Sequence, residues 1–321
     1  MTDNTTGTGN TGSAGRTGRT GRTGRTESAG DVLDARTAND LLNSPGHRAG
    51  LNDLHLEVTS LTRRFPWLTR ISGVVPGLAD TAAADPSTWA HPNLALRLAI
   101  PDATDALGPL IGQAGLCRRV YTVADVDPVA GTLDIDIVVH GETSPVMRWL
   151  AGLTPGDRVD FAGPRPHPAP TEAARAGGRI HLLADGSAYP AASAIARSVP
   201  GVATVVLALP GASPRISDYA GDFPGAGLRF AASSPTPLSD AMTMLDVGPT
   251  DTVWAAGERE DIRAVRTRCL RDAGMTKAQV QVFGYWRQGR TGTDADVARL
   301  TAIAGLRKQG RTLDDDFDVE I

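Results

Sequence analysis

The chain has 321 residues, which is long enough to bury a substantial core and, at ~100–200 residues per domain, to form two domains. Its formal net charge is −4, and no Lys/Arg-rich run with interleaved aromatic residues occurs, which argues against a nucleic-acid-binding protein. The two cysteines, Cys117 and Cys269, have neither metal-type nor redox-type spacing, so a disulfide framework, a zinc site and an iron–sulfur cluster all lack ligands.

Both ends of the chain are expected to be solvated. Residues 1–30 are mostly Thr, Gly, Ser and Arg with an Arg-Thr-Gly repeat, and such a polar tract cannot offset its ordering entropy. Its four arginines leave open a contact with a phosphate-bearing partner or a membrane surface. Residues 307–321 predict a solvated acidic tail. No run of ~18 apolar residues and no signal-peptide core occur, so we expect a cytoplasmic protein without a membrane span.

After a short helical lead-in over residues 31–52, residues 53–163 predict a small antiparallel barrel. Short runs of alternating polarity are separated there by Gly and Pro. The six predicted strands cover residues 54–58, 68–73, 94–100, 120–126, 132–139 and 157–162. One helix is predicted over residues 146–151, at the turn after the fifth strand.

Residues 164–178 are rich in Pro, Ala and Gly and predict a linker, after which residues 179–306 change in pattern. Near-continuous apolar strands are predicted over residues 180–184, 203–209, 228–230, 252–255 and 280–283, with helices over residues 188–199, 237–245 and 261–273. Strands buried on both faces and separated by helices indicate a parallel α/β sheet, whose ligands bind at the carboxyl ends of the strands.

The fourth barrel strand carries residues that suit a flavin dinucleotide. The planar guanidinium of Arg119 can form a forked pair with a pyrophosphate. Tyr121, two positions along, emerges on the same face and can lie beside an isoalloxazine ring, while Thr122 supplies a hydroxyl for a ring nitrogen. An ordinary buried strand with a half-exposed tyrosine would explain the same pattern.

A second segment, residues 140–149, is a turn that opens a helix. Backbone N–H groups at a helix start, together with the helix dipole, favour phosphate oxygens. His140 at the beginning of the turn is a candidate ligand for the flavin, and a satisfied core histidine is the alternative. The remaining histidines have no metal-ligand spacing, so no metal site is predicted.

These blocks, with residues 184–191, 254–258 and 284–287 further along, resemble the siderophore-interacting protein family. Its members are flavin-dependent ferric-siderophore reductases built like ferredoxin reductases. The resemblance covers roughly residues 53–289. Residues 119–122, 140–141, 254–258 and 284–287 match the family's motifs.

Two turns depart from the family. Ser144-Pro145-Val146 stands where the family has Gly-Pro-Ala, and Ala184-Asp185-Gly186 stands where it has Gly-Asp-Glu. Tyr189 replaces a leucine of the same motif. Two other readings therefore stay open: a flavin enzyme that acts on another substrate, for example in secondary metabolism, and a non-redox binder of a small molecule.

The resemblance implies an oxidoreductase in which NADH or NADPH passes hydride to flavin adenine dinucleotide (FAD), and FAD passes single electrons to chelated iron. FAD would be held by Arg119, Tyr121, Thr122, His140, Ser144, Arg148, Trp149, Asp185, Ser187 and Trp286. The nicotinamide would lie near Ala256, Gly257 and Glu258, and an anionic ferric siderophore near Arg148, Arg287 and Arg290. No catalytic acid or base is expected, because the cofactor carries the chemistry. No motif fixes the oligomeric state, and a monomer is favoured.

Overall fold

The computed structural model describes residue 40 and residues 48–102, 115–141, 144–211 and 214–308. The predicted tail over residues 1–30, most of the predicted lead-in and the acidic end beyond residue 308 lie outside this part of the chain. Within the described part, no helix is both long and apolar enough to cross a membrane.

The first half of the described chain forms a closed antiparallel barrel, as predicted. Its strands are β1 (Asn52–Phe65), β2 (Leu68–Val74), β3 (Leu94–Pro101), β4 (Leu116–Asp127), β5 (Thr132–Val138) and β6 (Arg158–Pro166). They follow the order β1-β2-β5-β4-β3-β6, and β6 pairs with β1 to close the barrel. Closure satisfies the backbone groups that an edge strand would expose.

Side chains that alternate along these strands fill the barrel with an apolar core. Leu56, Leu98 and Ile135 are completely buried within it. A close backbone contact also fixes one position: a Cβ atom at Gly73 would lie 2.4 Å from the carbonyl oxygen of Glu57 on the neighbouring strand. Apolar and polar side chains alternate along these strands because every second side chain faces the core. This alternation is why all six strands could be predicted from the sequence.

Among the described residues, three helices accompany the barrel, namely α3 (Leu78–Ala84), α4 (Pro86–Trp89) and α6 (Pro145–Gly152). Only α6 was predicted. The sequence does carry a start signal for α4, because Asp85 caps the backbone N–H of Thr88 and a proline occupies the first turn. At four residues, the helix is too short to show a periodic pattern.

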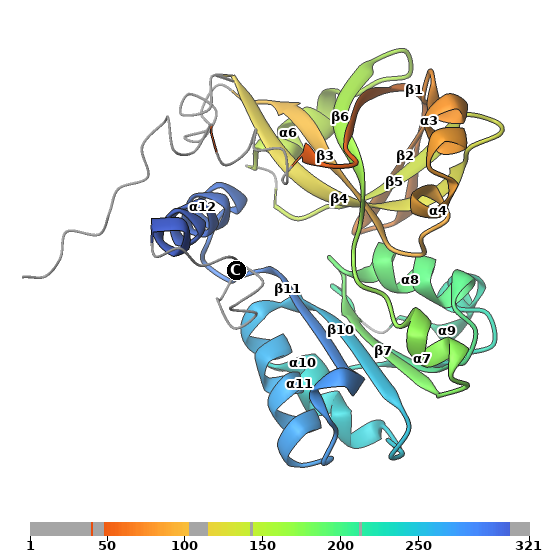
Figure 1. The fold of residues 1–321 in the computed structure, drawn as a ribbon, viewed down its shortest axis with the longest axis vertical. Helices are drawn as coiled ribbons and strands as arrows, with labels where there is room; N and C mark the ends of the chain where they lie inside the picture. The colour runs from red at the N-terminus through yellow and green to blue at the C-terminus, as the bar shows by residue number, and fades with distance from the viewer. Residues whose placement is uncertain (1–39, 41–47, 103–114, 142–143, 212–213, 309–321) are drawn as a thin grey trace, which may run out of the picture. The chain divides into compact units, whose positions relative to one another are not determined.

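The second half forms the predicted parallel α/β sheet. Its strands are β7 (Ile180–Asp185), β8 (Val202–Ala208), β9 (Gly227–Phe230), β10 (Thr252–Glu258) and β11 (Val280–Trp286), in the order β11-β10-β7-β8-β9. Every adjacent pair is parallel. The principal helices are α8 (Tyr189–Ser198), α10 (Pro237–Ala241) and α11 (Arg259–Arg271). Figure 1 shows α8 on one side of the sheet and α10 and α11 on the other.

Each face of this sheet has its own core. Leu182 and Val205 pack beneath α8, whereas Leu183 and Val206 pack with α10 and α11. Consecutive residues of one strand thus enter different cores, and both are apolar. This arrangement explains the continuous apolar runs in the sequence.

Several segments differ from the sequence prediction. Residues 164–178, predicted as a linker, contain the end of β6 and a short helix, α7 (Thr171–Arg175), in their Ala-rich part. The predicted helix over residues 237–245 ends at Ala241 and continues as the 3-10 turn Met242–Met244. Neither α9 (Ile216–Tyr219) nor α12 (Gly292–Lys308) was predicted. The Ala, Thr and Gly content of α12 gives it a weak apolar stripe, so its pattern resembles a polar segment.

A cluster of charged groups joins the barrel to the sheet domain. Arg70 binds both carboxylate oxygens of Asp136 at 2.7 and 2.9 Å. Arg64 bridges Asp136, at 3.2 Å, to Asp222 of the sheet domain, at 2.7 Å. The hydroxyl group of Tyr189 donates a hydrogen bond to the same Asp222 carboxylate. These part-buried charges are all paired, as their desolvation requires.

Tyr189, where the family has leucine, has a structural explanation. Its ring packs edge-on against Phe65 and Trp67 of the barrel and against Tyr219 and Phe223 of the sheet domain. Its side chain is completely buried, and burial together with the neighbouring Asp222 raises the pKa of its hydroxyl group. The larger residue therefore adds aromatic contacts and one hydrogen bond to the junction.

We expect Tyr189→Phe to lower the free energy of unfolding by about 1–3 kcal/mol, because it removes a hydrogen bond to a part-buried carboxylate. Urea unfolding measures this change. Ser217→Ala is the matched control, because it removes a hydrogen bond to the exposed Asp218 and should cost no more than about 0.5 kcal/mol. Equal stabilities of the Tyr189→Phe variant and the wild type would show that this hydrogen bond does not stabilise the junction.

Candidate functional site

The carboxyl ends of β7, β10 and β11 meet at one carboxylate, that of Asp185. Its Oδ1 atom accepts hydrogen bonds from Ser187 N at 2.8 Å, Ser187 Oγ at 2.5 Å and Ala188 N at 3.2 Å. Its Oδ2 atom accepts from Glu258 N at 2.9 Å and from Trp286 Nε1 at 2.7 Å. Burial raises the pKa of Asp185, and the hydrogen bonds from Ser187 and Trp286 oppose that rise.

Gly257 makes this arrangement possible. Its φ of +153° lies in a region that side chains rarely adopt, and a Cβ atom there would lie 2.6 Å from Cγ of Asp185. Glycine therefore lets β10 pass directly against the carboxylate. The predicted residues Asp185, Ser187, Gly257, Glu258 and Trp286 thus form one contiguous cluster, in which Ala256 is buried.

Glu258 extends this cluster towards helix α11. It is the N-cap of α11, and its Oε2 atom accepts from the backbone N–H groups of Glu260 at 2.7 Å and Asp261 at 3.1 Å. Its Oε1 atom accepts from Gln288 N at 3.1 Å, in the segment that follows β11. The carboxylate therefore fixes the chain after Trp286 to the start of α11.

Arg119, the predicted pyrophosphate ligand, contacts the start of α12. Its Nη2 atom donates to Thr293 Oγ1 at 2.7 Å, and its Nη1 atom donates to the carbonyl of Arg118 at 2.9 Å. A Cβ atom at Gly292 would lie 2.9 Å from Nε of Arg119. The close approach of α12 to β4 was not visible in the sequence, because α12 itself was not predicted.

The other two residues of the predicted flavin strand lie in different surroundings. Tyr121 packs against the barrel core, and burial raises the pKa of its hydroxyl group. Thr122 lies beside the hydroxyl group of Tyr285 at the end of β11. Burial raises the pKa of Tyr285, and hydrogen bonding by Asn93 and Thr122 opposes that rise. Residues of the barrel and of the sheet therefore meet at Thr122.

Asn93 is a polar residue at this place that the sequence analysis missed. It is 1% exposed, and its Nδ2 atom donates to the carbonyl of Pro168 at 3.1 Å. Since a carbonyl only accepts, the other amide atom is the oxygen, Oδ1. This acceptor is buried and has no hydrogen-bond partner among the described residues. No signal in the sequence distinguishes Asn93 from an ordinary turn residue before a strand.

The second predicted segment begins helix α6. Ser144 is its N-cap and accepts from Met147 N at 3.2 Å, so the residue that replaces the family's glycine supplies a cap. His140 and Arg148 are exposed, and Arg148 reaches to 4.0 Å from Asp102. Trp149 packs against the barrel core instead of standing in solvent.

Arginines gather around the start of α11. Arg287 lies 3.4 Å and Arg263 lies 3.6 Å from the Glu260 carboxylate. Burial lowers the pKa of Arg259, and the nearby Arg287 and Arg263 lower it further. Arg290 is exposed in the same segment as Arg287. A positively charged surface therefore borders the Asp185–Trp286 cluster, with Glu260 as a counter-charge.

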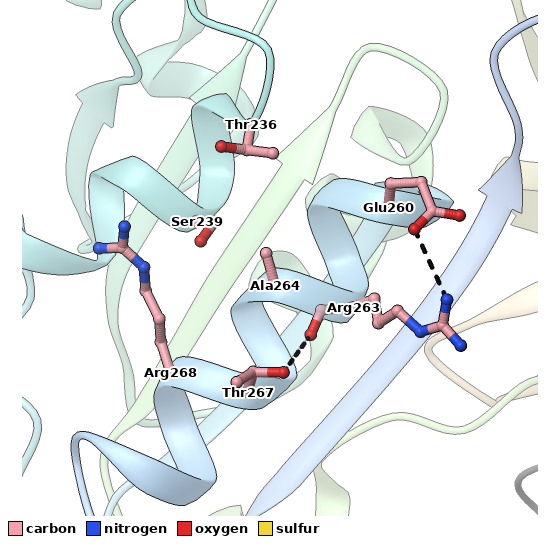
Figure 2. Close-up of a pocket in the computed structure, with 7 residues that line it drawn as sticks. All are labelled: Thr236, Ser239, Glu260, Arg263, Ala264, Thr267 and Arg268. Atoms are coloured by element: carbon pink, nitrogen blue, oxygen red, sulfur yellow. Dashed lines mark hydrogen bonds and ion pairs between the residues drawn. The ribbon is translucent and has the colours of Figure 1, made fainter. Parts of the chain in front are cut away.

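A shallow pocket of about 400 Å³ lies beside these arginines, between α10 and α11. Figure 2 shows the residues that line it, which are Thr236, Ser239, Glu260, Arg263, Ala264, Thr267 and Arg268. None of the predicted flavin or nicotinamide residues lines it. Its two arginines have carboxylate neighbours, because Arg263 approaches Glu260 and Arg268 approaches Asp240 at 3.4 Å.

Comparison with known proteins identifies the family of this chain. A model described as the siderophore-interacting FAD-binding domain matches residues 99–167, which contain β4 and α6. A model described as the siderophore-interacting protein matches residues 178–289, which contain the sheet as far as Trp286. The chain belongs to the siderophore-interacting protein family.

Individual relatives agree with this assignment. The chain is 28% identical over 287 residues to the ferric acinetobactin reductase of Acinetobacter baumannii, covering 88% of this chain and 95% of the relative. The structure of the siderophore-interacting protein from Acinetobacter baumannii matches with a TM-score of 0.67 at 27% identity, over 80% of this chain and 100% of that one. The structure of the siderophore-interacting protein SipS from Aeromonas hydrophila matches with a TM-score of 0.60 at 25% identity, over 75% of this chain and 94% of that one. The family and the fold predicted from the sequence are therefore confirmed.

We expect Gly257→Ala to lower the free energy of unfolding by about 2–4 kcal/mol, because the methyl group combines backbone strain with a contact against the Asp185 carboxylate. Gly289→Ala is the control. It also has a positive φ, of +75°, but a Cβ atom there meets open space, so its cost should stay near 1 kcal/mol. Equal losses for the two variants in urea unfolding would exclude close packing at Gly257.

Proposed function

We propose that this protein is an FAD-dependent reductase that uses NADH or NADPH to reduce ferric iron held by a siderophore, and so releases iron in the cytoplasm. One observation carries the proposal. The chain that contains the Arg119-Tyr121-Thr122 strand also presents a parallel-strand edge with Asp185, Gly257 and Trp286, and β11 brings Tyr285 to Thr122. A flavin site and a dinucleotide site would thus adjoin each other.

The described residues fit FAD. Arg119 offers a permanently charged guanidinium suited to a diphosphate, and the hydroxyl group of Thr122 can donate or accept. The Asn93 side chain lies beside Tyr285, and its buried Oδ1 atom lacks a donor among the described residues. An oxidised isoalloxazine ring has one N–H group, so it can supply a donor of the kind that this acceptor lacks.

The reaction divides into the chemistry of the cofactor and the work of the protein. When bound, FAD supplies the conversion of one hydride equivalent into single electrons. Arg119 would neutralise the diphosphate, and Tyr121 and Thr122 would contact the ring. Asp185 and Gly257 would shape the edge on which the nicotinamide lies. No side chain of this chain need transfer a proton.

Electrostatics favours an anionic iron chelate as the substrate. Arg287 and Arg290 are exposed near the carboxyl edge of the sheet, and Arg148 is exposed on α6. Hard oxygen ligands hold Fe(III) much more tightly than Fe(II), so reduction would release the metal. Positive charge along the approach would attract an anionic complex more strongly at low ionic strength.

The departures from the family motifs are compatible with this proposal. Ser144 forms an N-cap, and Gly186 lies where a Cβ atom would be 3.2 Å from the Pro210 ring. Both substitutions therefore suit the local packing. Neither alters Arg119, Tyr121 or Thr122, the candidate flavin ligands on β4.

We expect Arg119→Ala to weaken FAD binding by about one to two decades, because a charge-assisted pair with the diphosphate contributes ~1.5–3 kcal/mol. Titration of flavin-free protein with FAD measures this affinity. Arg158→Ala is the control, since Arg158 is a well-exposed barrel arginine whose partner is Asp160 at 2.7 Å. Equal affinity of the Arg119→Ala variant and the wild type would remove Arg119 from the flavin site.

A second experiment tests the reaction itself. Under anaerobic conditions, NADH or NADPH should bleach the absorption of the bound flavin, and a ferric siderophore should restore it, with Fe(II) captured by a ferrous chelator. Bleaching without reoxidation by any ferric siderophore would favour a flavin enzyme with another substrate. Purified protein that neither contains nor binds flavin would favour a non-redox binder.

A further inference from the structure

The strand order places a ligand-binding position at the end of β7. The chain passes from β7 to β8 on one side, whereas β10 lies on the other side of β7. Strand order therefore reverses between β7 and β10. In open α/β sheets, ligands bind outside the carboxyl ends of the strands at such a reversal.

The indole of Trp286 crosses this position. Trp286 belongs to β11, the edge strand, yet its Nε1 atom donates to Asp185 at the end of β7, and β10 lies between these two strands. Gly257 of β10 has no side chain to obstruct the crossing. Trp286 remains 48% exposed, although the single polar atom of its side chain is engaged in this hydrogen bond.

Asp185 is unsuited to bind a ligand directly. Five donors converge on its two oxygens at 2.5–3.2 Å, and an ionised carboxylate has about four lone-pair directions. A sixth partner would have to displace one of them. What the carboxylate does instead is fix an exposed aromatic ring at the strand reversal.

We propose that Asp185 is a positioning residue that orients Trp286, and that the exposed face of the Trp286 indole stacks against the nicotinamide ring of the reductant. This inference rests on the proposed function and deepens it. A flat ring on an exposed indole gains offset stacking only if the indole keeps one orientation, and the hydrogen bond to a buried carboxylate supplies that constraint.

The charges around Trp286 agree with a dinucleotide as the occupant. Arg287 follows Trp286 directly, and Arg259 lies near Arg287. The pKa of Arg259 is lowered chiefly by burial and further by the charge of Arg287. A nicotinamide dinucleotide carries a negatively charged diphosphate. With its nicotinamide ring on Trp286, that diphosphate would have these arginines close by as partners.

The test measures binding without turnover. FAD-loaded wild type, Asp185→Asn, Trp286→Phe and the double variant are titrated calorimetrically with NAD⁺ and with NADP⁺, and the tighter nucleotide is used throughout. We expect each single variant to raise Kd by about three- to tenfold, the range of a stacking contribution. The double variant should lose less affinity than the sum of the two single losses, because without the indole N–H the carboxylate no longer orients the ring.

A spectroscopic signature separates positioning from general stability. The indole N–H resonance of Trp286, identified by its loss in Trp286→Phe, should shift and exchange faster with water in Asp185→Asn. Trp67→Phe is the matched control, because it also removes an indole hydrogen bond, to Tyr219 at 3.4 Å, within the buried junction. It should lower the melting temperature and leave both the Trp286 resonance and the nucleotide Kd unchanged.

Three outcomes would overturn the inference. The first is an unchanged Kd in Asp185→Asn, and the second is a double variant whose loss equals the sum of the single losses. If Asp185→Asn does not fold, the nucleotide Kd of Trp286→Phe tests the inference by itself. The third overturning outcome is a Kd of Trp286→Phe equal to that of Trp67→Phe. Wild type that binds FAD but neither nucleotide would overturn the proposed function as well, whereas wild type that binds a nucleotide confines the failure to the role of Trp286.

Discussion

A buried carboxylate at the carboxyl edge of the sheet is the constraint on which the candidate site depends. Asp185 collects donors from the turn after β7, from the end of β10 and from Trp286 of β11. Burying a charged group is unfavourable unless its hydrogen bonds are made, so the three strand ends must keep their relative positions. Gly257 is required in that geometry, because any side chain would meet the carboxylate.

At the junction between the barrel and the sheet, the part-buried charged groups likewise have their partners. Arg64 is paired with Asp222 across it, Arg70 is paired with Asp136 on the barrel side, and the ring of Tyr189 packs among aromatic residues from both sides. Tyr189 departs from the family motif, yet it adds aromatic contacts and a hydrogen bond to this junction. From the sequence alone, the change from leucine to Tyr189 suggests altered ligand binding. In the structure, packing at the junction explains it.

Membership of the siderophore-interacting protein family and the geometry support each other at different levels. The family matches establish the FAD-binding domain and the fold. The structure adds the neighbours of each predicted residue: Arg119 touches Thr293, Thr122 lies beside Tyr285, and Asp185 has a complete set of protein donors. These neighbours are the basis for the separate roles proposed for Arg119, Thr122 and Asp185.

The sequence by itself determined the six barrel strands, the five parallel strands and the principal sheet helices, because alternation and apolar runs record burial locally. It did not reveal α3, α4, α7 or α9, which are too short to show a period, or α12, whose apolar stripe is weak. Only the tertiary structure determined which residues contact each other at the site. Asp185 and Trp286 are 101 residues apart, and Arg119 and Thr293 are 174 apart. Contacts at such separations depend on strand order and chain reversal, which no local pattern encodes.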